Sequence, residues 1–308
     1  MTDMTDPCNA EACVWSYDQA FARNLGLIQP DEQQRLRDCR VAIAGMGGVG
    51  GVDLVALARL GVGKFTIADP DTFDVVNTNR QYGAASSTIG LSKADVMAKL
   101  VRDINPTVEV TVFTDPIGPE NADAFLRDAN VLVDGIDAFE IGVRRLLFRQ
   151  AAQRGIYAVS AGPFGFSTVW AVFDPHGMSF DRYFDFRDDM DQIDQFAAFV
   201  VGMAPKATHR GYIDLSNIDF RKRCGPSAGL ACHLSSGVTA AEVLKILLRR
   251  GPLRPVPYYH QFDAYLGKCA DGRLPFGNRG PLQRWKRRML ARFLRKGIRH
   301  AEDVPRLS

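Results

Sequence analysis

The sequence lacks paired cysteines. Its six cysteines are scattered along the chain, at Cys8, Cys13, Cys39, Cys224, Cys232 and Cys269. None belongs to a C-x-x-C motif of the kind that holds structural zinc, so we expect free thiols and no structural zinc. The sequence also lacks a charged-then-apolar leader and an uninterrupted run of about eighteen apolar residues, so neither secretion nor a membrane span is supported. We expect a cytoplasmic protein without a membrane partner.

The net charge of the chain is also small. The formal net charge is +3 over 308 residues, which is too small to indicate a polyanionic partner for the body of the protein. Basic residues gather only in the last segment, residues 276–308, where arginines and lysines alternate with apolar residues such as Trp285 and Phe293. This pattern predicts a basic amphipathic helix. Two roles stay open for it: contact with RNA or an acidic partner, or packing of its apolar side on its own subunit.

The sequence does contain a glycine-rich turn between a short apolar run and a helix. Residues 41–44 are apolar and too few for a helix, which predicts a buried strand. The turn contains Gly45, Gly47, Gly48 and Gly50, in the G-x-G-x-x-G spacing that brings backbone N–H groups to a phosphate. A second strand, residues 64–68, leads to Asp69, where a carboxylate can accept from a ribose hydroxyl. An ordinary glycine turn does not explain this acid, so we expect a bound nucleotide.

The residues that follow Asp69 favour a triphosphate over a nicotinamide cofactor. Arg80 supplies a planar guanidinium suited to phosphate oxygens, and Lys93 begins another amphipathic helix. Asp137 follows an apolar strand, where a carboxylate can hold magnesium. Lys93 and Asp137 also have simpler explanations, because a lysine near a helix start is usually solvated and an aspartate after a strand often caps a helix.

Several motifs, taken in order, resemble the ThiF/MoeB superfamily of adenylating enzymes, which are related to ubiquitin-activating enzymes. They are FARNLGL, GMGGVG, DPDTFDVVNTNRQ, GLSKADVMAKLVRDINP and VLVDGIDAF. The resemblance implies that ATP is the nucleotide, that Asp69 contacts its ribose, and that Arg80 and Lys93 contact its phosphates. We expect Asp71 and Asn77, in the same stretch, to belong to the nucleotide site as well.

The same resemblance implies a magnesium ligand and a homodimer. Asp137 matches the acid that holds Mg²⁺ in the family. Arg23, in FARNLGL, resembles an arginine that reaches into the partner subunit's ATP site. Without that match, Arg23 would be interpreted as an exposed surface arginine.

The alternation of strands and helices predicts an α/β fold: a Rossmann-like, doubly wound and mostly parallel sheet. Ligands of such sheets bind at the carboxyl ends of the strands, where Asp69 and Asp137 both fall. We divide the chain into a mobile leader (1–14), an ATP-binding adenylation domain (15–275) and the basic helical tail (276–308). Residues 174–223 show little periodicity, which predicts an irregular crossover that acts as the specificity element.

Two cysteines near a late helix are candidate nucleophiles. Ser227 is a suitable cap for that helix, and a thiolate is stabilised near a helix N-terminus. Cys224, at the end of the crossover, is the preferred candidate for a covalent intermediate, although it can equally be a small residue before a Gly-Pro turn. Cys232 is better explained as a small buried residue.

These features lead to one main hypothesis and two alternatives. The main hypothesis is an ATP- and Mg²⁺-dependent adenylyltransferase that converts a carboxylate to an acyl-adenylate and releases pyrophosphate. The implied substrate is the C-terminus of a small ubiquitin-like or sulfur-carrier protein, or of a peptide. The first alternative is an RNA-modifying enzyme that resembles the tRNA threonylcarbamoyl-adenosine dehydratase. The second is a non-catalytic partner subunit of an activating enzyme, which the joint presence of Arg23, Arg80, Lys93 and Asp137 argues against.

Overall fold

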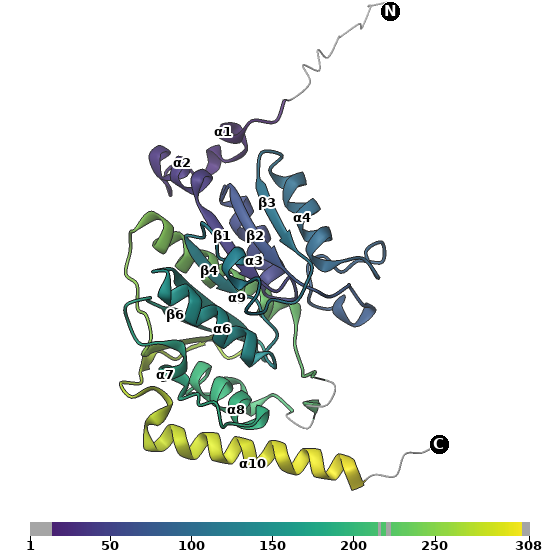
Figure 1. Ribbon diagram of the computed structural model, residues 1–308, viewed down its shortest axis with the longest axis vertical. Coiled ribbons are helices and arrows are strands. Elements are labelled where there is room, and N and C mark those ends of the chain that lie inside the picture. The colour runs from purple at the N-terminus through teal and green to yellow at the C-terminus, as the bar shows by residue number, and fades with distance from the viewer. Residues whose placement is uncertain (1–13, 215–216, 220–222, 304–308) are drawn as a thin grey trace, which may run out of the picture.

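A single mixed sheet runs through the computed structural model, which describes residues 14–214, 217–219 and 223–303 (Figure 1). The predicted leader therefore lies outside the described residues, apart from Val14. In chain order the strands are β1 (Arg40–Ala44), β2 (Lys64–Ala68), β3 (Glu109–Phe113), β4 (Val131–Asp134), β5 (Tyr157–Phe164), β6 (Ser167–Phe173), β7 (Tyr258–Asp263), β8 (Lys268–Cys269) and β9 (Gly272–Arg273).

The strand order across the sheet is β3-β2-β1-β4-β5-β6-β7-β8, and β9 pairs with β7. Strands β1 to β5 pair with one another in parallel, whereas β6, β7 and β8 extend the sheet beyond β5 in antiparallel fashion. The prediction of a mostly parallel α/β sheet is confirmed. Because β1 lies between β2 and β4, the chain leaves β1 in opposite directions on either side, which opens a crevice at the carboxyl ends of these strands.

Helices cover both faces of the sheet. In chain order they are α1 (Tyr17–Ala20), α2 (Pro30–Asp38), α3 (Gly50–Arg59), α4 (Lys93–Ile104), α5 (Ala122–Phe125), α6 (Ile141–Gln153), α7 (Phe180–Phe184), α8 (Gln192–Met203), α9 (Gly229–Leu248) and α10 (Pro281–Asp303). Short 3₁₀ turns occur at Ala22–Asn24 (η1), Val75–Asn77 (η2), Thr208–Gly211 (η3) and Gly277–Arg279 (η5).

Strand side chains alternate between two hydrophobic cores, as the pleat of a strand requires. In β1, Val41 and Ile43 pack into the core shared with α3, α4 and α9. Ala42 and Ala44 pack into the opposite core, which α6, α7 and α8 complete. Both faces are apolar, which explains why β1 appears in the sequence as a continuous hydrophobic run.

The crossover is more regular than predicted, because residues 174–223 contain α7 and α8. Polar residues of this segment serve as helix caps. The side chain of Ser179 accepts from the backbone of α7, and that of Asp191 accepts from the backbone of α8. Helix α8 lacks a polar face because it lies between the sheet and α10, and this conceals its helical period. The described residues between α8 and α9 include η3 and an isolated bridge between Asp219 and Cys224.

One helix start differs from the predictions. Helix α2 begins with Gln29 as N-cap, in a capping box with Glu32, whereas the cap of α9 was predicted differently. Helix α9 begins at Gly229 with Ala228 as N-cap, so Ser227 is not its cap.

Among the described residues, α9 is the helix whose length and apolar composition would allow it to cross a membrane. In this structure α9 packs against β5, β6 and α3.

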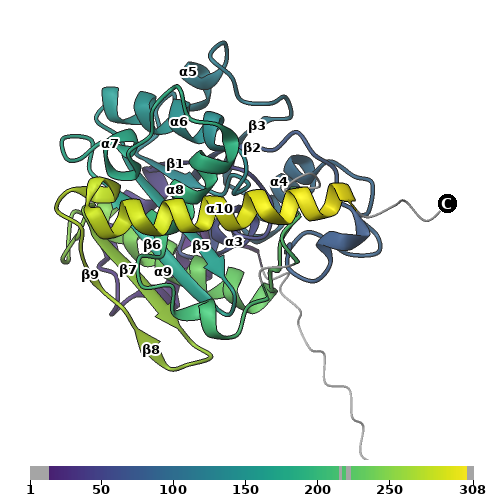
Figure 2. The ribbon, with the colours of Figure 1, turned by 90° about the horizontal axis from the view of Figure 1, so that it is seen from below.

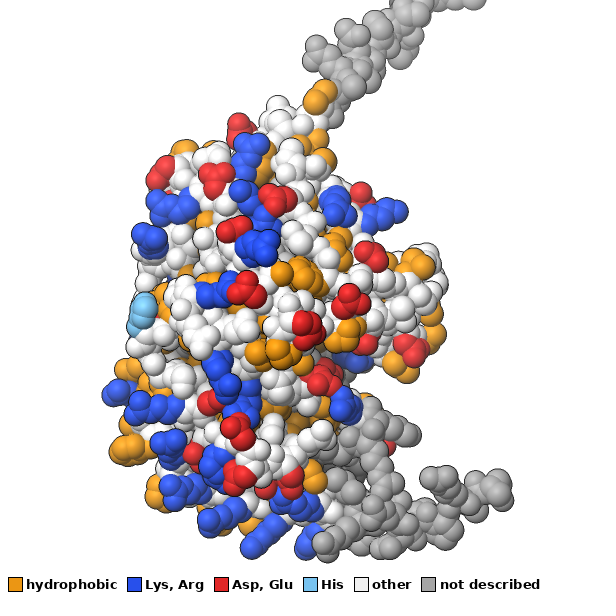
Figure 3. All heavy atoms as spheres, in the orientation of Figure 1, with side chains coloured by type: hydrophobic (Ala, Val, Ile, Leu, Met, Phe, Trp, Pro, Cys, Tyr) orange, Lys and Arg blue, Asp and Glu red, His pale blue; other side chains and the backbone are white. Residues whose placement is uncertain are grey.

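The predicted basic helix is present as α10, which lies along the lower edge of Figure 1 and across α8 in Figure 2. Ala291 and Leu294 are its buried apolar contacts, while Arg287 pairs with Asp185 at 2.8 Å. Its outer side leaves Trp285 58% exposed, and Lys and Arg side chains gather along this edge of the surface (Figure 3). The helix therefore docks on its own subunit and still presents a basic and apolar outer face.

Candidate active site

The carboxylate of Asp69 is fixed against the glycine-rich turn. Asp69 is the first residue after β2, and its Oδ2 accepts from the backbone N–H of Met46 at 2.7 Å. Its Oδ1 accepts from the N–H of Asp71 at 2.9 Å. Burial raises the pKa of Asp69, and these backbone donors and nearby Lys93 oppose that shift. The acid predicted from the sequence is therefore held at the mouth of the turn.

The turn itself depends on the close approach of three backbone segments. Gly45 has φ +91°, and a Cβ on Gly50 would lie 1.9 Å from the Gly45 carbonyl oxygen. A Cβ on Gly135, just after β4, would lie 2.7 Å from the Gly50 Cα. The turn after β1 thus packs directly on the end of β4, and it places the N-terminus of α3 in the crevice.

Lys93 and Asp71 form an ion pair beside this turn. Lys93 is the first residue of α4 and is 7% exposed, and its Nζ lies 3.0 Å from Asp71 Oδ2. A buried lysine at a helix start is not the solvated residue of the simpler explanation. Asn77 is also buried, but its Oδ1 accepts from the Asp74 N–H at 2.9 Å and so supports the turn η2.

Arg80 lies beside the glycine turn, next to Gly48. Its Nη1 donates to the Val76 carbonyl at 3.0 Å and to Asn79 Oδ1 at 2.9 Å. A Cβ on Gly48 would lie 3.4 Å from Arg80 Cγ. The structure therefore brings Arg80 to the same turn as Asp69.

Gln81 was not among the predicted site residues, although it belongs to the same NTNRQ stretch. Its carboxamide lies beside Gly47, where an added Cβ would be 3.7 Å from Gln81 Nε2. The residue is buried, and its Oε1 has no hydrogen-bond partner among the described residues. A buried, unpartnered amide oxygen at the turn marks Gln81 as a further candidate for ligand contact.

Asp137 is the exposed acid of the next loop. Its Oδ1 accepts from the Phe139 N–H at 2.9 Å, which leaves Oδ2 without a hydrogen bond among the described residues. Asp134, by contrast, is buried and receives Arg144 Nε at 2.7 Å and the Ser160 hydroxyl at 2.6 Å. Asp134 is thus structural, and Asp137 is the carboxylate of this loop that can meet a metal.

The fit to magnesium rests on this single free carboxylate oxygen. Protein-bound Mg²⁺ commonly uses one or two carboxylates and takes its other ligands from water and substrate phosphates. Asp137 meets that requirement. No group of three or more His, Cys, Asp or Glu side chains suited to a metal occurs within residues 14–214, 217–219 and 223–303.

The end of the crossover passes over the crevice. Asn79 Nδ2 donates to the Ser227 carbonyl at 2.9 Å, and Arg223 forms an ion pair with Glu140, three residues after Asp137. Cys224 lies between these two contacts and is exposed. Helix α9 begins only at Gly229, so Cys224 precedes the helix by more than one turn. The helix dipole therefore does not stabilise a thiolate at Cys224, contrary to the expectation from the sequence.

Cys232 is buried, as the sequence interpretation assumed, but its place was not foreseen. It lies on α9, and a Cβ on Gly48 would be 3.0 Å from its Sγ. Burial raises the pKa of the Cys232 thiol. Cys232 therefore packs against the glycine turn as a neutral thiol.

Arg23 lies far from the residues above in its own chain. It belongs to the exposed turn η1, and its neighbour Asn24 donates to the Leu60 carbonyl at 3.2 Å, just before β2 begins. This is the amino end of the strands, whereas Asp69 and Asp137 lie at the carboxyl ends. Arg23 therefore cannot complete the crevice of its own chain.

The ThiF family profile matches residues 21–276, so the chain belongs to the ThiF family. It is 41% identical over 127 residues to the tRNA threonylcarbamoyladenosine dehydratase of Haemophilus influenzae, covering 41% of this chain and 49% of that protein. It is 30% identical over 186 residues to a probable molybdopterin-synthase adenylyltransferase of Porphyra purpurea, covering 59% of this chain and 48% of that protein.

Among solved structures, Escherichia coli MccB with ATP has a similar fold. The TM-score is 0.64 at 16% identity, and the match covers 88% of this chain and 73% of that one. The chain spans about half the length of the curated relatives named above. These matches establish family and fold, and they leave the substrate open.

Proposed function

We propose that this protein is an ATP-dependent adenylyltransferase that activates a carboxylate as an acyl-adenylate. One observation carries the proposal: buried Lys93, Arg80, the glycine turn and Asp69 gather in one crevice, with the free carboxylate of Asp137 at its edge. Two cations, a ribose acceptor and a metal-binding acid are what nucleotidyl transfer from ATP needs.

Each side chain has a distinct part in the proposed reaction. Asp69 accepts from the ribose hydroxyls, and the backbone N–H groups of the glycine turn face the phosphates. Lys93 and Arg80 neutralise the charge that develops as the substrate carboxylate attacks the α-phosphorus and pyrophosphate leaves. Magnesium would supply further charge neutralisation between the phosphates, and Asp137 would hold it. The chemistry requires no general acid or base from the protein.

For the substrate we propose the C-terminal carboxylate of a small ubiquitin-like or carrier protein, or of a peptide. The relative named as a molybdopterin-synthase adenylyltransferase supports the activity class. In this chain the segment before α9 crosses the crevice between Asn79 and Glu140, where it can guide an extended tail. The segment is held at both ends and has little regular structure between them.

We also propose a homodimer in which Arg23 reaches the crevice of the partner. Arg23 is exposed, and Leu25 and Leu27 beside it are 50% and 79% exposed. Near the crevice, Val75 and Val76 are 68% and 70% exposed. In a symmetric dimer, Leu25 and Leu27 of each chain would pack on Val75 and Val76 of the other. This packing would bury both apolar patches and bring one Arg23 to each of the two crevices, as an isologous dimer requires.

A second substrate deserves a test because of two specific observations. The dehydratase of Haemophilus influenzae has the higher identity of the two curated relatives, and its name specifies a modified tRNA. In this chain α10 exposes Arg284, Arg288 and Arg292, spaced four residues apart along one side of the helix. Such a row matches the phosphates of an RNA backbone.

Pyrophosphate exchange into ATP separates the substrates. Exchange that depends on a carrier protein or peptide with a free C-terminus supports the main proposal, and amidation of that terminus should abolish it. Exchange that depends on tRNA carrying threonylcarbamoyladenosine, and that weakens in an Arg288→Glu, Arg292→Glu variant, supports the RNA alternative. Tight binding of NADH without binding of ATP would refute both.

A further inference from the structure

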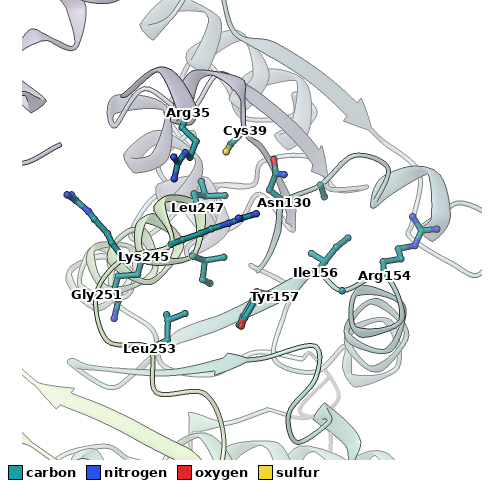
Figure 4. Close-up of a pocket in the computed structure, with 15 residues that line it drawn as sticks. Arg35, Cys39, Asn130, Arg154, Ile156, Tyr157, Lys245, Leu247, Gly251 and Leu253 are labelled. Atoms are coloured by element: carbon teal, nitrogen blue, oxygen red, sulfur yellow. The ribbon is translucent and has the colours of Figure 1, made fainter. Parts of the chain in front are cut away.

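A hollow of about 900 Å³ lies at the opposite edge of the sheet from the proposed ATP site. Asn130 and Tyr157, at the amino ends of β4 and β5, and Cys39, just before β1, belong to its lining (Figure 4). The end of α9 and the loop that follows it form another wall. We call this hollow the amino-edge cleft.

The amino-edge cleft is separate from the nucleotide crevice. Helix α9 connects the two: Gly229 at its start packs against Asn79, and Leu248 at its end accepts from Arg35 at 3.3 Å. A helix of 20 residues spans about 30 Å. A ligand in one site therefore does not occupy the other.

The cleft lining is strongly basic. Its cations are Arg35, Arg154, Lys245, Arg249 and Arg250, and no acid belongs to the lining. In Figure 4, Arg35 and Lys245 lie on one side of the hollow and Arg154 lies on the other. For a chain with a net charge of only +3, five cations around one hollow are a marked concentration.

Part of this charge already has a structural use. Lys245 pairs with Glu242 at 2.7 Å, Arg250 pairs with Glu32 at 2.9 Å, and Arg154 pairs with Asp123. Helices α2, α6 and α9 also end here, and their carbonyl ends favour cations. These facts explain three of the five cations, but they do not explain a hollow of ligand size.

Arg35 and Arg249 are the two cations that remain. The Arg35 guanidinium donates to the Leu248 carbonyl. The backbone N–H of Arg249 donates to the Ile246 carbonyl, but its guanidinium has no hydrogen bond or ion pair with a described residue. Arg249 also caps α9 with φ +54°, a left-handed conformation that usually selects glycine. The guanidinium of Arg249 is therefore available to a ligand in the cleft.

We propose that the amino-edge cleft binds a small phosphorylated molecule with an apolar or aromatic body. Arg35 and Arg249, on different elements, can hold phosphate oxygens with planar, charge-assisted hydrogen bonds. Ile156, Leu247 and Leu253 supply apolar wall for the rest of the ligand. The volume suits a ligand of nucleotide size. This inference does not depend on the proposed adenylation, because the cleft and the crevice share no residue.

Calorimetry with AMP and pyrophosphate as probes tests the cleft. The Lys93→Ala chain serves as the background, because that change weakens phosphate binding in the crevice. In this background we expect the probes still to bind, and Arg35→Ala and Arg249→Gly each to weaken binding about tenfold, as loss of a charge-assisted hydrogen bond implies. Arg59→Ala, at an exposed arginine in the last turn of α3, is the matched control and should change nothing. Arg249→Gly removes a left-handed arginine, so we expect that variant to fold normally.

Thiol labelling locates the bound probe. Cys39 lines the cleft, whereas Cys269 is exposed on β8 and lies outside it. Iodoacetamide labelling followed by peptide mass spectrometry should show AMP or pyrophosphate slowing the modification of Cys39 and leaving Cys269 unaffected. The proposal is overturned if the Lys93→Ala chain binds neither probe at millimolar concentration. It is equally overturned if Arg35→Ala and Arg249→Gly bind as the background does, or if Cys39 is not protected.

Discussion

Asp53 carries the sharpest stability prediction. It lies on α3, is fully buried, and has neither carboxyl oxygen in a hydrogen bond with a described residue. Burial, reinforced by the nearby Asp134 carboxylate, raises its pKa from 3.8 to about 8. At neutral pH the folded protein therefore holds a proton on Asp53 that the unfolded chain releases.

The sign and size of the pH effect follow from this difference. The contribution of Asp53 to the free energy of unfolding is fully present below pH 3.8 and is lost as pH rises toward 8. Each pKa unit is worth about 1.4 kcal/mol, so the whole shift corresponds to about 6 kcal/mol. In Asp53→Asn, a neutral amide of nearly the same shape replaces the carboxyl group and removes this dependence. Relative to wild type, the variant should gain stability steadily from pH 5 to pH 8 and then level off.

Urea denaturation at half-unit pH steps measures the difference between the two proteins. Asp103→Asn is the matched control, because it removes the carboxyl group of an exposed aspartate on α4. The steady gain in stability expected for Asp53→Asn should not appear in this variant. A flat Asp53→Asn difference, or one that falls between pH 5 and pH 8, would refute the assignment of a protonated, buried Asp53.

Three further predictions concern the crevice. Lys93→Ala and Asp137→Asn should each lower pyrophosphate exchange by about 10²- to 10³-fold with unchanged circular dichroism, as the loss of one charge-stabilising contact implies; wild-type rates in both would contradict the proposed roles. Mixing Arg23→Ala chains with Asp137→Asn chains should restore activity, since one site of each hybrid dimer keeps both residues; activity from a protein that stays monomeric would contradict the dimer. Gly50→Ala should lower the melting temperature sharply, because its Cβ would lie 1.9 Å from the Gly45 carbonyl oxygen; an unchanged melting temperature would show that the turn is looser than the structure indicates.

The parallel part of the sheet could be predicted because its residues carry local signals. In β1 and β4, apolar side chains face both cores, so each strand appears in the sequence as a short hydrophobic run that stops at a glycine or an acid. The same stops locate the crevice: Asp69 and Asp137 follow strands, and Lys93 begins a helix. Position along the chain was enough to bring these side chains to one edge of the sheet.

The regions that escaped prediction lack such local signals. Helix α8 is buried between the sheet and α10, so its apolar residues show no helical period. Cys232 reaches the glycine turn only because α9 packs beside α3, and the residues around Cys232 in the sequence do not indicate this packing. The amino-edge cleft gathers side chains from Arg35 to Leu253, so only the folded chain defines it. Tertiary packing decides these features, and sequence spacing does not record it.

Cys224 provides the last prediction, on whether the adenylate passes to the enzyme. Its thiol is exposed, and its backbone is fixed by reciprocal hydrogen bonds with Asp219, of 3.0 Å and 2.9 Å. The neighbouring Arg223–Glu140 ion pair ties this point to the loop of Asp137. Cys224 is thus held next to that loop with an exposed thiol, and transfer of the acyl group to this thiol remains a hypothesis to be tested.

If the acyl group moves to this thiol, Cys224→Ser should leave pyrophosphate exchange unchanged, because adenylate formation precedes transfer, and should abolish product formation. Cys269→Ser, at an exposed cysteine on β8, is the control and should alter neither step. Product release is followed with the substrate identified by the exchange assay, and a thioester should be trapped by acid quenching in wild type and be missing in Cys224→Ser. Full turnover in Cys224→Ser would instead mean that the acyl-adenylate reacts directly with an external amine or thiol, and Cys224 would then be a small residue that lets the chain turn at Gly225.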